Sequence, residues 1–129
     1  MAIVARAILD EGGLTGNIKP DTEFSEEDWL FSYFDCAPRD MYIEKVGALE
    51  TYIPEYADSL AELAIKFALQ PEGVTVALTS MHIREHAEAN ISVLEKAPLP
   101  ADVFDELRYR HRWIRNFYQA RKYLATQGV

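Results

Sequence analysis

The sequence predicts an α/β domain in which helices predominate, and three observations lead to this prediction. Residues 2–9 are short, apolar and β-branched in part, which is typical of a strand buried on both faces. Residues 74–79 form a second such segment, and stretches with apolar residues at helical spacing lie between and after the two. Because strands that alternate with helices form parallel β/α units, two strands make one right-handed crossover unit rather than a whole sheet.

The composition fits one soluble, intracellular domain over residues 1–129. Hydrophobic residues make up 49% and charged residues 26%, which is too apolar for disorder. With 13 Lys and Arg against 21 Asp and Glu, the net charge of −8 argues against a nucleic-acid partner, since binding to phosphate backbones depends on cations. The single cysteine, Cys36, excludes an internal disulfide and favours a reducing compartment. Arg6 and Asp10 interrupt the apolar start, so we expect no signal peptide, no membrane partner and a cytoplasmic location.

A long loop is predicted after the first strand. Residues 10–37 are rich in glycine and acidic residues, and residues 25–29 indicate a capped helical turn within them. A loop of this length in a compact domain is usually functional or ordered by what it covers. Its aromatic side chains predict that it covers apolar surface, either of its own chain or of a partner chain. These side chains are Trp29, Phe31, Tyr33 and Phe34.

Four helices are predicted in the rest of the chain. The first lies between Pro38 and Pro54, with Met41, Val46, Leu49 and Ile53 near one face. The second follows Asp58-Ser59 and places Leu60, Leu63, Ala64, Phe67 and Ala68 on its buried face. After the strand at 74–79, helices are expected over residues 82–95 and about 101–124. With the turn in the long loop, the prediction is two strands and about four to five helices.

Residues 5–16, ARAILDEGGLTG, and residues 73–81, GVTVALTSM, are among several segments that resemble, in order and spacing, the carboxyl-terminal part of the aldo-keto reductase family. Residues 5–16, ARAILDEGGLTG, resemble its seventh-strand segment, with Ile8 where the family usually has proline. Residues 59–69, SLAELAIKFAL, are similar to the helix before its eighth strand. Residues 73–81 and 84–90, GVTVALTSM and REHAEAN, are similar to that strand and the NADP-signature helix after it. Residues 111–118, HRWIRNFY, resemble the end of one bacterial branch.

The resemblance implies a partial TIM barrel, because the full fold has eight β/α units and about 250 residues. The family's catalytic aspartate, tyrosine, lysine and histidine follow its second, third and fourth strands, which have no counterpart in this sequence. It therefore implies no catalytic residue here, and activity only as an NADP-dependent oxidoreductase formed with another chain. Since strands without their barrel neighbours have open edges and bare faces, we expect self-association into a homodimer or larger oligomer.

The resemblance also implies part of an NADP-binding site, weak or vestigial. In the family, the loop after the seventh strand covers the pyrophosphate, where glycines allow the chain to approach closely. The helix after the eighth strand directs its amino end at the adenosine 2′-phosphate. In this chain histidines stand at the two usual basic positions of that helix. The implied cofactor-binding residues are Leu9, Gly12, Gly13, Leu14, Gly16, Ser80, Met81, His82, Arg84, His86 and Asn90.

Two further motifs point to other chemistry, and the sequence supports both less well. Residues 82–86, HIREH, fit the inverted zinc-protease motif, but no third ligand is marked, so we predict no metal. Residues 108–122 interleave arginines with aromatic residues, as single-stranded nucleic-acid binders do. The same aromatic residues also fit a packed helix face, so we predict no nucleic-acid partner.

Two classes of function remain open from the sequence. One is a truncated aldo-keto reductase module that retains nucleotide affinity or completes a site with another polypeptide. The other is a non-enzymatic interaction or scaffold domain in which the cofactor loops are only structural. The first is favoured because both cofactor-facing segments are present.

Overall fold

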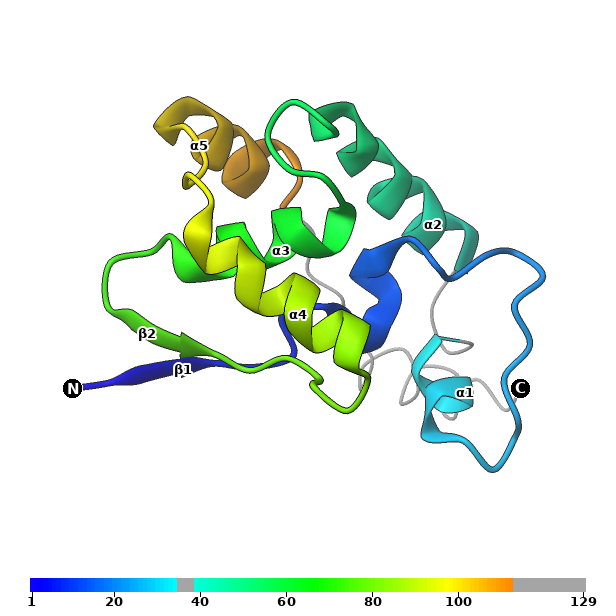
Figure 1. The fold of residues 1–129 in the computed structure, drawn as a ribbon. Coiled ribbons are helices and arrows are strands. Elements are labelled where there is room, and N and C mark those ends of the chain that lie inside the picture. Colours follow the sequence, from blue (N-terminus) through cyan, green and yellow to red (C-terminus); the bar gives the residue numbers. More distant parts are fainter. Residues whose placement is uncertain (35–38, 113–129) are drawn as a thin grey trace.

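The computed structural model describes residues 1–34 and 39–112 (Figure 1). Within these ranges the chain forms two strands, five α-helices and three short 3₁₀ helices, which confirms the mostly helical α/β prediction. The elements follow in the order β1 (Ile3–Ala5), η1 (Asp10–Thr15), α1 (Trp29–Phe34), α2 (Arg39–Gly47), η2 (Ala48–Tyr52), α3 (Leu60–Leu69), β2 (Val74–Ala77), α4 (Arg84–Ser92), η3 (Val93–Glu95) and α5 (Ala101–Arg110). None of the described helices is long and apolar enough to cross a membrane.

The two strands pair in parallel, as expected for a β/α crossover unit. Ile3 lies opposite Val74 and Ala5 opposite Ala77, with an irregularity in the register after Ile3. The amide of Leu78 donates to the carbonyl of Ala5 at 2.8 Å, so the pairing extends beyond the last residue of β2. Both strands therefore end at the same edge of the sheet.

The first strand differs from its prediction in length and in burial. β1 covers three residues rather than 2–9, and Ile3 and Val4 are 42% and 52% exposed. Helices α3 and α4 lie on one side of the strands (Figure 1). The expectation of burial on both faces is wrong for the described residues, because apolar strand residues remain open to solvent where parallel sheets usually carry helices.

Helix α3 is the central helix of the core. It begins after Asp58-Ser59, as predicted, and the hydroxyl of Ser59 accepts the Glu62 amide at 3.1 Å and caps the helix. One core cluster joins η2, α3 and α5 and consists of Tyr52, Ala57, Leu63, Leu99, Val103 and Leu107. The side chain of Gln70 binds both the amide and the carbonyl of Leu99 at 3.0 and 2.9 Å, which fixes the start of α5 against the end of α3.

A second core cluster, Phe34, Tyr42, Val46 and Leu60, joins α1 and α2 to α3. The predicted helix between Pro38 and Pro54 is present as α2 and η2, but Met41 is 46% exposed. Tyr42, at 3% exposed, replaces Met41 on the buried face. The reason is spacing, since Tyr42 lies four residues before Val46, one helical turn away, whereas Met41 lies five before it.

The aromatic residues of the long loop pack within the chain. Phe34 is 1% exposed, and its ring stacks on Phe24 with centroids 5.5 Å apart. It also meets Tyr33 and Tyr42 edge to face, at 5.0 and 5.5 Å. The loop therefore covers an apolar surface of its own domain, while Trp29 stays 54% exposed.

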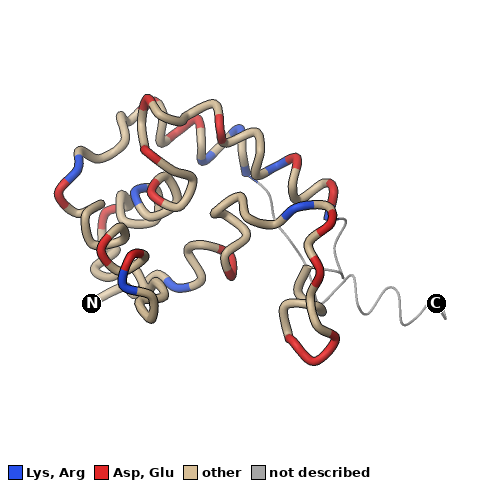
Figure 2. The backbone as a smooth tube through the Cα atoms, turned by 45° about the vertical axis from the view of Figure 1, so that its right-hand side comes forward, with Lys and Arg blue, Asp and Glu red and all other residues tan. Residues whose placement is uncertain are grey.

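A partly buried network of charges ties the segment after α4 to α3. Glu62 is only 6% exposed, and its carboxylate accepts Lys66 at 2.9 Å and also Lys96. Lys96 reaches Asp58 at 2.7 Å as well, and Lys66 donates to the carbonyl of Tyr56 at 2.8 Å. Elsewhere acidic residues are spread along the chain with fewer basic residues between them (Figure 2).

The last predicted helix is only partly within the described residues. Helix α5 ends at Arg110, and the stretch of the predicted 101–124 helix from residue 113 onward lies outside them. Cys36 and Pro38 lie outside them too.

Candidate functional site

The two predicted cofactor segments leave the sheet at the same edge. Because β1 and β2 are parallel, residues 6–16 and 78–84 both follow carboxyl ends of strands. Figure 1 shows both segments continuing from the strands on the side away from the N-terminus. In open and closed α/β folds, ligands bind beyond the carboxyl ends of the strands. This pairing makes the two segments leave the sheet at the same edge.

The loop after β1 has an unusual backbone that is held by its own hydrogen bonds. Asp10, Glu11 and Gly12 have positive φ values of 46°, 55° and 89° in succession, a region that favours glycine. The carbonyl of Leu9, which is half-buried, accepts the amides of both Gly12 and Leu14 at 3.0 Å. These two amides are therefore used within the loop. Gly16 ends the turn at φ 77° with its amide bonded to Gly13.

Gly12 is the position in this loop that leaves room for a ligand. A Cβ added there would meet nothing within 4 Å. Close approach of a phosphate group to the backbone at this point is thus sterically open. A group that approached the loop here would meet open backbone at Gly12, whereas the amides of Gly12 and Leu14 are already bonded to Leu9.

Gly13 has a different role, in packing. It is buried, and a Cβ added there would lie 1.9 Å from the Tyr42 hydroxyl oxygen. The glycine lets the loop after β1 pack directly on α2, so packing in the core is sufficient to require a glycine here.

The Gly13→Ala substitution is expected to lower the free energy of unfolding by about 1–3 kcal/mol, because the added methyl must displace a buried ring. Gly47→Ala is the matched control, since a Cβ at Gly47 in α2 meets nothing within 4 Å and alanine favours helix. Urea unfolding of both variants measures the difference. Equal stabilities of the two variants would show that Tyr42 does not limit the space at Gly13.

The segment after β2 is exposed and locally ordered by side-chain hydrogen bonds. Ser80, Met81 and His82 are all exposed. The hydroxyl of Ser80 and Nδ1 of His82 lie 2.5 Å apart, and Nδ2 of Asn90 donates to the Ser80 carbonyl at 3.2 Å. The fold thus brings together Ser80, His82 and Asn90, three of the predicted cofactor residues.

The amino end of α4 has no side-chain cap. Ile83 precedes the helix and offers no hydrogen-bond acceptor in its side chain, so the first amides of α4 are not capped there. Such an end favours an anion. Arg84 is exposed and binds Glu88 at 2.8 Å along the helix, and His86 is exposed as well. Because exposed i,i+4 pairs are weak, Arg84 can turn from Glu88 to a phosphate at little cost.

The histidine motif at 82–86 gains no further ligand from the fold. Among residues 1–34 and 39–112, no group of three His, Cys, Asp or Glu side chains is placed to hold a metal ion. The arginine-rich stretch is described only as far as Arg112. In it, the guanidinium of Arg108 lies 5.5 Å from the centre of the Tyr109 ring.

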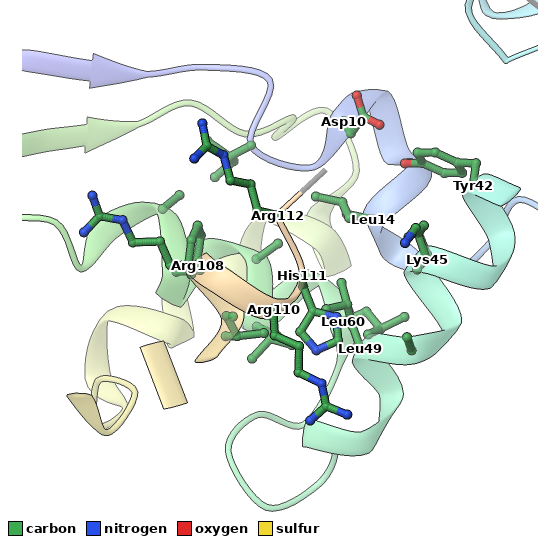
Figure 3. Close-up of a pocket in the computed structure, with 18 of the residues that line it drawn as sticks. Asp10, Leu14, Tyr42, Lys45, Leu49, Leu60, Arg108, Arg110, His111 and Arg112 are labelled. Carbon is green, nitrogen blue, oxygen red and sulfur yellow. The ribbon is translucent and has the colours of Figure 1, made fainter. Parts of the chain in front are cut away.

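A large groove between η1, α2, α3 and the end of α5 was not predicted (Figure 3). Its volume is about 770 Å³, and its apolar walls include Leu14, Leu49, Leu60, Leu63, Ala64 and Phe67. Of the predicted cofactor residues, Leu14 lines it, but those after β2 do not. A sign of this groove in the sequence is the apolar helix face that carries Leu60, Ala64, Phe67 and Ala68, all of which line it.

His111 lies in this groove beside a buried tyrosine. Its Nε2 is 3.1 Å from the Tyr52 hydroxyl, and the two rings meet edge to face. Burial, and then the charge of Arg110, lower the pKa of His111, while burial and Glu106 raise the pKa of Tyr52. Both groups are therefore held in their neutral forms at neutral pH.

Comparison with known proteins agrees with the resemblance seen in the sequence. The model of the aldo/keto reductase family matches residues 1–109 of the 129. Comparison with curated proteins and with solved structures gives no match. The matched range includes both strands, the glycine loop and the whole of α4. The chain belongs to the aldo/keto reductase family.

Proposed function

We propose that this chain is an oxidoreductase-type module that binds NADP(H) between the loop after β1 and the amino end of α4. The observation that carries the proposal is the parallel pairing of β1 and β2, which sends both segments from the same edge of the sheet. The open approach at Gly12 and the uncapped end of α4 support it. In this arrangement Gly12 lies under the pyrophosphate, His82 and Arg84 bind the 2′-phosphate, and Asn90 lies by the adenine.

We propose that the chain does not reduce a substrate by these residues alone. NADPH, when bound, supplies a hydride, but protonation of a carbonyl oxygen requires a general acid such as a tyrosine. None of the residues placed at this edge has that role. Catalysis would therefore depend on further β/α units that carry the family's catalytic group. We also propose that the protein is located in the cytoplasm.

NADPH is expected to bind this chain more tightly than NADH, and Arg84→Gln to weaken NADPH about tenfold while leaving NADH nearly unchanged. The reason is that a charge-assisted hydrogen bond to the 2′-phosphate is available only to NADPH. Isothermal titration calorimetry of the full chain measures both ligands. Lys19→Gln is the control, because Lys19 is an exposed cation outside both segments.

Absence of heat at millimolar NADPH, with circular dichroism showing folded protein, would contradict nucleotide binding. It would favour the second function, an interaction domain. One observation supports that alternative: Ile83 before α4, Ile91 on it and Leu94 after it are 39%, 56% and 70% exposed. We propose that a second copy of the chain covers this surface in a homo-oligomer, which light scattering tests against the monomer mass of 14.7 kDa.

A further inference from the structure

The groove between η1, α2, α3 and α5 has the size and lining of a ligand site. Its volume of about 770 Å³ lies within the range of about 300–1,000 Å³ that small-molecule pockets occupy. Leu60, Ala64 and Phe67 form one wall from α3, and Leu14 and Leu49 contribute from η1 and η2. An apolar chain placed here would lose contact with water along most of its length.

The same groove gathers cations in a chain that is acidic overall. Ten of the 13 Lys and Arg residues lie in the described ranges, since Arg115, Arg121 and Lys122 do not. Four of these ten line the groove: Lys45, Arg108, Arg110 and Arg112. Figure 3 shows Arg108 and Arg112 on one side, Lys45 on the other and His111 between them. This concentration produces a positive field over an apolar cavity.

Most of these charges lack a carboxylate partner in the described part of the chain. Arg110 binds Glu106 at 2.6 Å, but no ion pair joins Lys45, Arg108 or Arg112 to another described residue. Two acids, Asp10 and Glu44, also line the groove. Asp10 accepts a hydrogen bond from the Tyr33 hydroxyl. Within the described residues, Lys45, Arg108 and Arg112 are thus not bound to a carboxylate.

We propose that this groove binds an amphiphilic anion, a straight-chain aliphatic carboxylate, with its aliphatic chain along α3 and its head group at Arg112. The apolar walls would contact the aliphatic chain of the ligand, and the positive charge at the mouth of the groove would bind its carboxylate. An uncharged apolar ligand would make no ion pair with the cations. A small inorganic anion would leave the apolar walls in contact with water. The site is separate from the residues after β2 that are proposed to hold the nucleotide.

Calorimetric titration of the full chain with octanoate, decanoate and dodecanoate tests this site. Affinity is expected to rise about fourfold for each added methylene group, which is the transfer free energy of a buried CH₂. Dodecanol and dodecyltrimethylammonium are expected to bind more weakly than dodecanoate, because they lack the negative head group. Arg112→Gln should weaken dodecanoate about tenfold, and Lys19→Gln, which removes a cation outside the groove, should not.

Filling the groove separates this proposal from its alternatives. Ala64→Trp places a large ring on its wall and should abolish dodecanoate binding while the chain stays folded and its mass in solution is unchanged. Absence of saturable binding by the wild type, or equal binding of dodecanol, would overturn the proposal. A changed mass for Ala64→Trp would assign the groove to a second copy instead. If hydrogen exchange in Ala64→Trp became faster only in residues 113–129, the groove would be assigned to residues 113–129 instead of to a ligand.

Discussion

Replacing Glu62 by alanine is expected to lower the free energy of unfolding by about 3–5 kcal/mol, the range for removing one partner of a buried ion pair. The Lys66 side chain is 9% exposed and 2.9 Å from Glu62, so its ammonium would remain buried without its carboxylate. Lys96 would lose its link to α3 and keep only Asp58. The segment after α4 would then be held less firmly against α3.

Urea unfolding followed by circular dichroism measures this loss, and two variants serve as controls. Glu88→Ala removes an exposed carboxylate from the i,i+4 pair with Arg84 and should change stability little. Replacing Glu62 and Lys66 together by methionine should restore much of the lost stability, because no charge is then left buried alone. If Glu62→Ala is no less stable than Glu88→Ala, the network does not hold α3 and the segment after α4 together.

The Glu62 network also predicts a pH dependence. Burial raises the pKa of Glu62, but the hydrogen bonds from Lys96 and Lys66 lower it, and the net pKa is below the usual 4.5. A carboxyl whose pKa is lower in the folded state contributes stability fully above its unfolded pKa. Stability should therefore fall as the pH drops from about 4.5 through the lower folded pKa, and this slope should be smaller in the double methionine variant.

The Phe34→Ala variant is expected to lose about 3–5 kcal/mol, because it removes a large side chain from a packed core. Phe34 is 1% exposed and contacts the rings of Phe24, Tyr33 and Tyr42. Its loss should separate the long loop from α2. Thermal unfolding and hydrogen exchange of residues 24–34 measure the effect.

Trp29→Ala is the matched control for Phe34, since Trp29 lies in the same helix and is 54% exposed. Its effect on unfolding should be clearly smaller. Should Trp29→Ala destabilise the chain as much as Phe34→Ala, the aromatic residues would instead contribute to an interface with a partner, as the sequence had allowed.

Local patterns in the sequence predicted most of the helices. Ser59, followed by apolar residues at helical spacing, was sufficient to predict α3. Pro38 and Pro54 were sufficient to predict the limits of the helical region that contains α2 and η2. The prediction that Met41 is buried was wrong because the buried face of the helix carries Tyr42, one turn before Val46. Met41, one position earlier, lies off that face. The burial of β1 could not be judged from composition, because it depends on which elements lie over the sheet, and this is not a local property.

The site was predicted only in part. The loop after β1 and the start of α4 were found through their likeness to a family, and the parallel strands give them a common edge. The packing of Gly13 on Tyr42 was not foreseeable, because it joins residues 29 positions apart. The groove was not foreseeable for the same reason, since its walls come from five separate elements.

Hydrogen exchange of the full chain with and without NADPH tests most directly whether the two segments form one nucleotide site. Slower exchange in both residues 9–16 and residues 80–90 is the predicted result, with little change in the groove-lining residues of α5. Protection of only one segment, or of neither at saturating NADPH, would contradict the account, because the parallel pairing of β1 and β2 would then not have brought a cofactor site together.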